Sequence, residues 1–110
     1  MIMNKIKKII KCFIYPQFFK SYINFVCPLF ELVPLLNKID NINTIIDIGS
    51  NKGQFSTLVR FFFPNAKIYS FEPQKKYLAI QKKILKKKNI RYFNIGLGNK
   101  KSLKKFFITL

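Results

Sequence analysis

An alternation of strand-like and helix-like segments from Asn43 onward most strongly limits how this chain of 110 residues folds. The β-branched run at residues 44–48 is typical of a strand buried in a parallel sheet, and a glycine-containing turn follows it. Apolar residues then recur at helical spacing over residues 53–63, until Pro64-Asn65 ends the pattern. The region therefore begins as a strand, a turn and a crossover helix.

The same rhythm continues toward the C-terminus. Residues 67–72 are predicted to form a second strand, residues 74–87 a second helix and residues 90–95 a third strand. Right-handed crossovers place these strands in the spatial order third, second, first. The turn at residues 96–100 is too short for a parallel crossover, so the strand predicted at residues 103–109 is expected to pair antiparallel or to turn a corner. The expected fold class is α/β, the first half of a Rossmann-like sheet.

Residues 1–40 are predicted to form an N-terminal helical segment, followed by a domain at residues 41–110. Residues 2–14 carry isoleucines on one helical face and lysines on the other, and a proline-interrupted helical segment is expected around residues 25–38. The first helix either docks on the domain, which we favour, or makes peripheral contact with an anionic membrane through residues 1–14. No apolar run approaches the ~20 residues that span a bilayer, and no signal cleavage site follows, so a cytoplasmic location is expected.

Carboxylates are scarce, since four Asp and Glu residues stand against 21 Lys and Arg residues. Asp47 lies just before the glycine turn, and Glu72 ends the second predicted strand. The carboxyl ends of parallel strands share one edge, so both acids should meet the turn there. Gly49 and Gly53 let the backbone approach a ligand closely, and a carboxylate about twenty residues beyond such a turn suits the hydroxyls of a ribose. We therefore predict a site for a nucleotide-like cofactor, although a buried acid, turn glycines and a helix entrance would explain these residues individually.

The spacing of the glycines separates cofactor classes. Dinucleotide-binding folds use G-x-G-x-x-G, whereas this turn reads D-x-G-x-x-x-G, which gives pyrophosphate binding little support. An acid before the turn and another at the end of the second strand resemble the first motifs of class I S-adenosylmethionine-dependent methyltransferases. More closely, IDIGSNKGQF at residues 46–55, FEP at residues 71–73 and GLGNK at residues 96–100 resemble the FkbM family, over residues 43–109.

This resemblance implies a pocket for S-adenosylmethionine along the sheet edge. Glu72 would hold the ribose, Asp47 would orient the turn or reach the amino group, and the end of the third strand would border the adenine through its backbone. The implied cofactor-binding residues are Asp47, Gly49, Ser50, Asn51, Gly53, Glu72, Gly96 and Leu97. The implied reaction is O-methylation of a sugar, glycan or other small metabolite. The chain has no histidine and two cysteines, so neither a catalytic base nor a metal site can be assigned.

Families of this kind continue through further strands and the segments that shape the acceptor pocket. We therefore expect these residues to be the amino-terminal part of the methyltransferase domain, as a fragment or a decayed copy that lacks most of the acceptor half. The first strand, central in a complete sheet, would then have one unpaired edge.

The formal net charge of +17 favours an anionic partner, although biased composition explains the same excess equally well. The alternative function is a basic nucleic-acid-binding module on the second predicted helix. Its phosphate contacts and stacking rings would come from Lys82, Lys83, Lys86, Lys87, Lys88, Tyr77 and Tyr92. We rank it below the methyltransferase, because these lysines lie on the predicted solvent face and no nucleic-acid-binding motif accompanies them.

Overall fold

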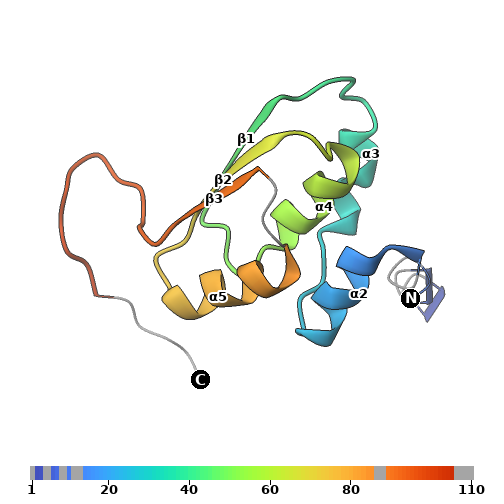
Figure 1. Cartoon of the computed structure of the whole chain (residues 1–110), viewed down its shortest axis with the longest axis horizontal. Coiled ribbons are helices and arrows are strands. Elements are labelled where there is room, and N and C mark those ends of the chain that lie inside the picture. Colours follow the sequence, from blue (N-terminus) through green and yellow to red (C-terminus); the bar gives the residue numbers. More distant parts are fainter. Residues whose placement is uncertain (1, 4–5, 8–9, 11–13, 86–88, 106–110) are drawn as a thin grey trace.

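The computed structural model describes residues 2–3, 6–7, 10, 14–85 and 89–105. It contains one parallel sheet whose strands alternate with helices (Figure 1). The strands are β1 (Thr44–Ile48), β2 (Lys67–Phe71) and β3 (Ile90–Phe93). The helical elements are α2 (Pro16–Ile23), the 3-10 turn η1 (Phe30–Leu32), α3 (Val33–Leu36), α4 (Gln54–Phe62) and α5 (Lys75–Ile84).

The strand order is β1-β2-β3, with both pairs parallel, and this confirms the predicted spatial order. Ile46 lies beside Tyr69, which in turn lies beside Arg91 on β3. Helix α4 connects β1 to β2, and α5 connects β2 to β3, as βαβ units require. The carboxyl ends of all three strands therefore lie along one edge.

Among the residues that the structure describes, the helices cover one face of the sheet (Figure 1). Along β1 the side chains alternate between exposed and buried, with Ile45 buried and Ile46 and Ile48 61% and 63% exposed. The prediction of a buried first strand was therefore wrong for three of its five side chains. Both crossovers run in the same direction across the sheet, so right-handed connections place both helices on the same side.

The core lies between the sheet and these helices. Its largest cluster consists of Phe18, Leu36, Ile45, Leu58, Val59, Phe63, Ala66 and Ile68. Phe18 belongs to α2, which lies within the segment predicted to be helical, residues 1–40, but between the two helices expected there. Pro16 occupies the first turn of α2, where the missing backbone N–H is not needed by the helix. Segments on both sides of residue 40 thus share one core.

The chain that follows β3 contains no strand as far as Lys105, and it runs away from the sheet (Figure 1). The predicted antiparallel strand at residues 103–109 is wrong for residues 103–105, which are exposed, and residues 106–109 lie outside the described residues. The predicted helix at residues 2–14 is described only in part, with helical backbone at residues 2–3, 6–7, 10 and 14. Among the described helices, none combines the length and apolar character that crossing a bilayer requires.

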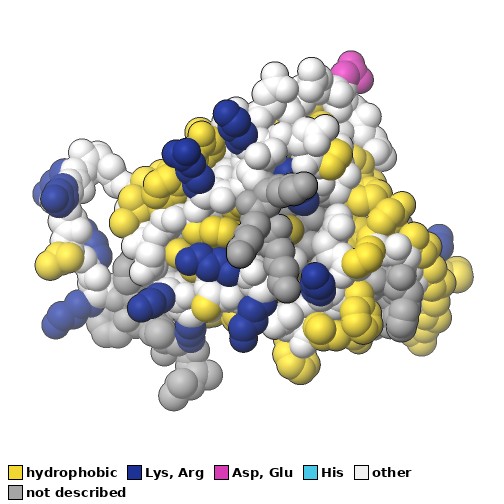
Figure 2. Space-filling view, in the orientation of Figure 1, with side chains coloured by type: hydrophobic (Ala, Val, Ile, Leu, Met, Phe, Trp, Pro, Cys, Tyr) yellow, Lys and Arg dark blue, Asp and Glu magenta, His cyan; other side chains and the backbone are white. Residues whose placement is uncertain are grey.

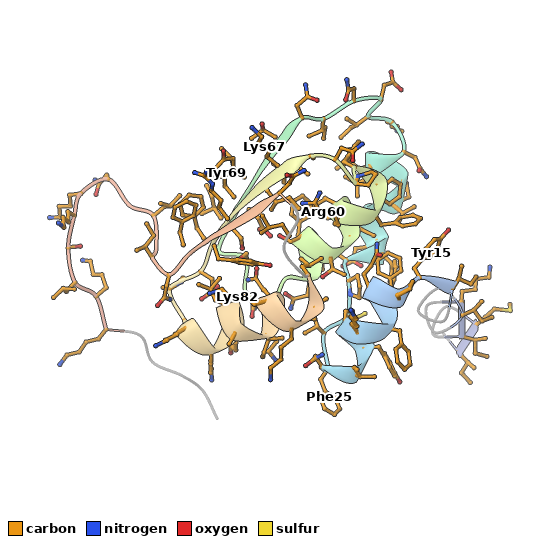
Figure 3. All side chains as sticks on the ribbon, viewed as in Figure 1. Tyr15, Phe25, Arg60, Lys67, Tyr69 and Lys82 are labelled. Atoms are coloured by element: carbon orange, nitrogen blue, oxygen red, sulfur yellow. The ribbon has the colours of Figure 1, made fainter. Side chains whose placement is uncertain are left out.

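Arg60 joins the end of α4 to the loops that lead into β2 and β3 (Figure 3). Its Nη1 donates to the carbonyl oxygens of Pro64 at 2.7 Å and Ala66 at 2.9 Å, and its Nη2 reaches the carbonyl oxygen of Asn89 at 3.4 Å. Partial burial lowers the pKa of Arg60, while Tyr92 acts in the opposite direction. The guanidinium thereby satisfies carbonyl groups from two separate loops.

Replacing Arg60 by Lys should lower the free energy of unfolding by about 1 kcal/mol, because an ammonium cannot reproduce the planar fork of donors. Urea denaturation followed by circular dichroism measures this difference. Arg91→Lys, at an exposed position, is the matched control and should leave the midpoint unchanged. Equal midpoints for the two variants would show that the Arg60 bonds do not stabilise the fold.

Candidate functional site

The turn after β1 is built from residues with left-handed backbone. Gly49, Asn51 and Gly53 have φ angles of 68°, 52° and 89°. The amides of Gly49 and Ser50 both donate to the carbonyl oxygen of Phe71, at 2.9 and 3.0 Å. These bonds fix the turn against the end of β2, so residues twenty positions apart are held at the same edge of the sheet.

Glu72 is held between this turn and α5. Its Oε2 accepts a hydrogen bond from the amide of Asn51, and its Oε1 accepts one from the amide of Gln74, both at 2.8 Å. The side chain is only 5% exposed. Each carboxylate oxygen has two lone pairs, so one acceptor position remains on each. Glu72 therefore both supports the entrance of α5 and retains acceptor capacity at the turn.

Asp47 lies beneath the turn, 7% exposed, and accepts a hydrogen bond of 2.5 Å from Ser56 Oγ. Burial raises the pKa of Asp47; side-chain and backbone hydrogen bonds from Ser56 oppose this shift, and the negative charge of Glu72 adds to it. The two acids are thus close enough to interact. Through these bonds to Ser56, Asp47 lies at the positive, amino-terminal end of α4, where a negative charge is favoured.

The raised pKa of Asp47 has a consequence for stability. Between the ordinary pKa and the raised one, the folded state binds more protons than the unfolded state, so stability falls as the pH rises through this window. A buried acid that lowers stability at neutral pH is a candidate for a functional group.

Asp47→Asn should therefore unfold at a higher urea concentration than the wild type at pH 7, since the amide still accepts the Ser56 hydroxyl without a buried charge. The difference should shrink below the ordinary aspartate pKa of about 3.9. Urea midpoints across this pH range measure it. Asp40→Asn, at an exposed acid, is the control. A difference in urea midpoint between Asp47→Asn and the wild type that stays constant with pH would show that the pKa of Asp47 is not raised.

A buried polar network holds the underside of the turn. Gln81 Nε2 donates to Ser50 Oγ at 2.7 Å and to the carbonyl oxygen of Asn51 at 2.5 Å. Ser70 Oγ lies 2.6 Å from Ser50 Oγ and 2.8 Å from Gln81 Oε1. Gln81, Ser50 and Ser70 are all buried. Helix α5 is therefore tied to the turn by side chains, and the hydroxyl of Ser50 faces inward.

The sequence analysis gave Gln81 no part in the site. A glutamine within an otherwise apolar helical stripe was the available signal, because a buried amide requires partners. Ser56 and Ser70 were missed as well, since single serines in a helix and a strand have no distinctive pattern.

The two glycines of the turn have different surroundings. A Cβ at Gly53 would lie 2.9 Å from Gln81 Cγ, so the absence of a side chain here serves the packing of α5. A Cβ at Gly49 would have no atom within 4 Å. Gly53 is therefore approached closely by the protein's own Gln81 side chain, and the open space lies over Gly49.

Gly53→Ala should destabilise the fold more than Gly49→Ala. Both substitutions force alanine into a left-handed conformation, at about 1 kcal/mol each, but only the first also collides with Gln81. Thermal unfolding measures both effects, and Gly98→Ala, where a Cβ would lie 3.9 Å from the carbonyl oxygen of Lys100, is the control. Equal losses at Gly49 and Gly53 would show that α5 does not require a glycine there.

The end of β3 reaches the same edge through Asn94. Its Nδ2 donates to the carbonyl oxygens of Glu72 at 3.0 Å and Pro73 at 2.8 Å. A Cβ at Gly96 would lie 3.9 Å from Pro73, and Leu97 is 51% exposed. The structure therefore brings Gly96 beside the Glu72-Pro73 segment, while Leu97 is an exposed residue just beyond it.

Comparison of the chain with models of known protein families and with curated proteins found no match. The site is therefore interpreted from its own chemistry. It combines two buried carboxylates, an open space over a glycine and a turn fixed from three directions. Within the described part of the chain, both carboxylates are hydrogen-bonded to hydroxyl or backbone N–H groups rather than to lysine or arginine side chains.

Proposed function

We propose that this edge of the sheet binds S-adenosylmethionine and that the chain is part of a methyltransferase that uses it. The observation that carries the proposal is the hydrogen bond from the Asn51 amide to the Glu72 carboxylate. It unites the glycine turn and the acid at the end of β2, two of the three features on which the FkbM resemblance depends.

The chemistry of the site fits that cofactor. S-adenosylmethionine carries an ammonium group, a sulfonium group and a ribose with two hydroxyls. Glu72 would accept hydrogen bonds from the ribose hydroxyls through its remaining lone pairs, and Asp47 would add negative potential beneath the turn. The open space over Gly49 leaves room for the methionine portion. A phosphate at the same place would be repelled by both carboxylates.

When bound, the cofactor supplies an electrophilic methyl group, which an acceptor takes in an in-line displacement. The residues described here act by holding and orienting it, because the rate of such a reaction depends on alignment. The acceptor that we propose from the family resemblance is a hydroxyl of a sugar or small metabolite. The chain contains no histidine to act as the base for that hydroxyl.

Glu72→Gln should weaken binding of S-adenosylhomocysteine at least about tenfold, because the amide has one acceptor oxygen where the carboxylate has two. Isothermal titration calorimetry measures the affinity, and circular dichroism checks that the variant is folded. Glu31→Gln, which neutralises an exposed glutamate, is the matched control and should bind like the wild type.

ATP provides a second comparison, since it contains the same adenosine with an anionic triphosphate. It should bind more weakly than S-adenosylhomocysteine. Absence of S-adenosylhomocysteine binding by the folded wild type, or equal binding by the Glu72 and Glu31 variants, would refute the proposal.

The alternative of a nucleic-acid site on α5 has less support. Lys52 Nζ and Lys76 Nζ lie 5.5 and 5.0 Å from the centre of the Tyr77 ring, and Lys82 Nζ lies 5.5 Å from that of Tyr92. The Tyr92 hydroxyl donates to the carbonyl oxygen of Leu85, and burial raises the pKa of Tyr92 to about 12. Both rings are thus engaged by the protein itself. Residues 86–88 of that prediction lie outside the described residues.

A further inference from the structure

The turn that ends α2 has a phenylalanine at a position where helices ordinarily have glycine. The amide of Phe25 donates to the carbonyl oxygen of Tyr22 at 2.9 Å. The amide of Val26 donates to the carbonyl oxygen of Ser21, also at 2.9 Å. These two bonds form a Schellman motif, in which the residue after the C-cap has a left-handed backbone. Phe25 is that residue, with a φ of 57°, and this conformation is strained for any residue with a Cβ.

The Phe25 side chain contributes little to packing. It is 92% exposed and extends away from the molecule at the end of α2 (Figure 3). The residues around it are firmly held, since Ser21 Oγ donates to the carbonyl oxygen of Val26 at 2.7 Å, and Val26 packs against Ile84 and Leu85. The fold therefore keeps a strained backbone in place and leaves its aromatic ring exposed. Strain of this kind points to a function in binding.

Further apolar side chains are exposed beside Phe25. Tyr22 and Ile23, in the last turn of α2, are 58% and 56% exposed. The segment before α2 adds a stripe of isoleucines at helical spacing, 50–74% exposed: Ile2, Ile6, Ile10 and Ile14. At these positions the stripe is not buried against the domain. Hydrophobic side chains gather over α2 and the residues that precede it (Figure 2), and a surface of this kind normally marks a contact site.

Lysines lie next to this apolar surface. Lys82 and Lys83 are exposed in the last turn of α5, and Lys20 lies in the last turn of α2. The contact of Val26 with Ile84 brings the turn after α2 to this end of α5. Neither α2 nor α5 contains an Asp or a Glu. The surface therefore combines exposed apolar side chains with positive charge.

This combination selects among possible occupants. A second copy would bring together two chains of formal charge +17, which repel each other. Nucleic acid would attract the lysines but would offer little to the aliphatic isoleucines. An anionic bilayer accepts both, because its headgroups attract lysines and its acyl boundary takes up aliphatic and aromatic side chains. We infer that α2 and its C-terminal turn bind an anionic lipid surface, with Phe25, Tyr22 and Ile23 entering the acyl boundary and Lys82 and Lys83 contacting headgroups.

The lipid surface goes beyond the proposed function and lies apart from its site. Glu72 supports the amino end of α5 through the amide of Gln74, whereas Val26 packs against the carboxyl end of α5. Helix α2 packs on α4 and α5, on the helix-covered side of the sheet. The further helices of a doubly wound sheet would lie on the opposite face, away from this surface. Glu72→Gln should therefore leave lipid binding unchanged, and the two proposals fail independently.

The chain contains no tryptophan, so Phe25→Trp introduces a single fluorescent reporter. Its emission should shift to shorter wavelength on addition of vesicles made of phosphatidylcholine and phosphatidylserine in equal parts, because the ring leaves water. Leu103→Trp places the same reporter at a fully exposed position beyond β3 and is the matched control. Its emission should not change.

Phe25→Gly separates lipid binding from stability. Glycine relieves the left-handed strain, so the urea midpoint should rise. Loss of the ring should nevertheless weaken binding to these vesicles about tenfold, as measured by co-sedimentation. A purely structural role for Phe25 predicts a lower midpoint and unchanged binding. Leu103→Gly, the control, should bind like the wild type.

A pair of double variants tests the lysines. Lys82→Ala/Lys83→Ala should weaken binding to the anionic vesicles about tenfold. Lys100→Ala/Lys101→Ala removes the same charge from exposed positions beyond β3 and should weaken binding less than about threefold. Vesicles of phosphatidylcholine alone should bind the wild type more weakly than the anionic vesicles. Circular dichroism checks the folding of each variant.

Unchanged emission of Phe25→Trp on addition of vesicles would overturn the inference, and so would wild-type vesicle binding by Phe25→Gly. Equal losses from the two lysine pairs would overturn it as well, because binding would then follow overall charge alone. A dimer in sedimentation equilibrium that dissociates on Phe25→Gly would assign the surface to a second copy instead.

Discussion

The attachment of the glycine turn to the end of β2 is the constraint on which the candidate site depends. The Phe71 carbonyl accepts two turn amides, and the Glu72 carboxylate accepts a third from Asn51. These bonds satisfy three consecutive N–H groups of the left-handed turn, and each contributes about 1 kcal/mol to stability. Gln81 completes the arrangement from α5. The site is therefore formed where a turn, a strand end and a helix satisfy one another.

The second general feature is the difference between the two faces of the sheet. The helix-covered face contains the core and the buried Asp47, while the other face presents isoleucines, aromatic rings and cations. Both helices lie on one side because both crossovers run in the same direction with the same hand. The candidate site at the strand ends and the open face thus arise from one topology.

Much of the fold was predictable, because hydrophobic periodicity and turn residues act locally. The bounds of β1 matched the prediction, and β2, α4 and α5 differed by a few residues at their ends. Helix α2 lies within the N-terminal segment predicted to be helical, but between the helices expected at residues 2–14 and 25–38, so its bounds were not predicted. The predicted strand at residues 103–109 was wrong where it is described, since apolar residues alone do not supply a pairing partner. The sequence analysis predicted that Glu72 lies near the turn but not which groups it accepts hydrogen bonds from. Hydrogen-bond geometry depends on backbone positions, which sequence spacing does not define.

The sequence by itself determined the order of strands and helices, the scarcity of carboxylates and their positions at strand ends. These follow from residue type and spacing, which act over a few neighbouring residues. Only the tertiary structure decided that Gly53 serves Gln81, that Asp47 is covered by Ser56 and that one sheet face is open. Those facts depend on contacts between residues far apart in the chain. Such contacts arise when elements pack, and the local pattern of each element does not contain them.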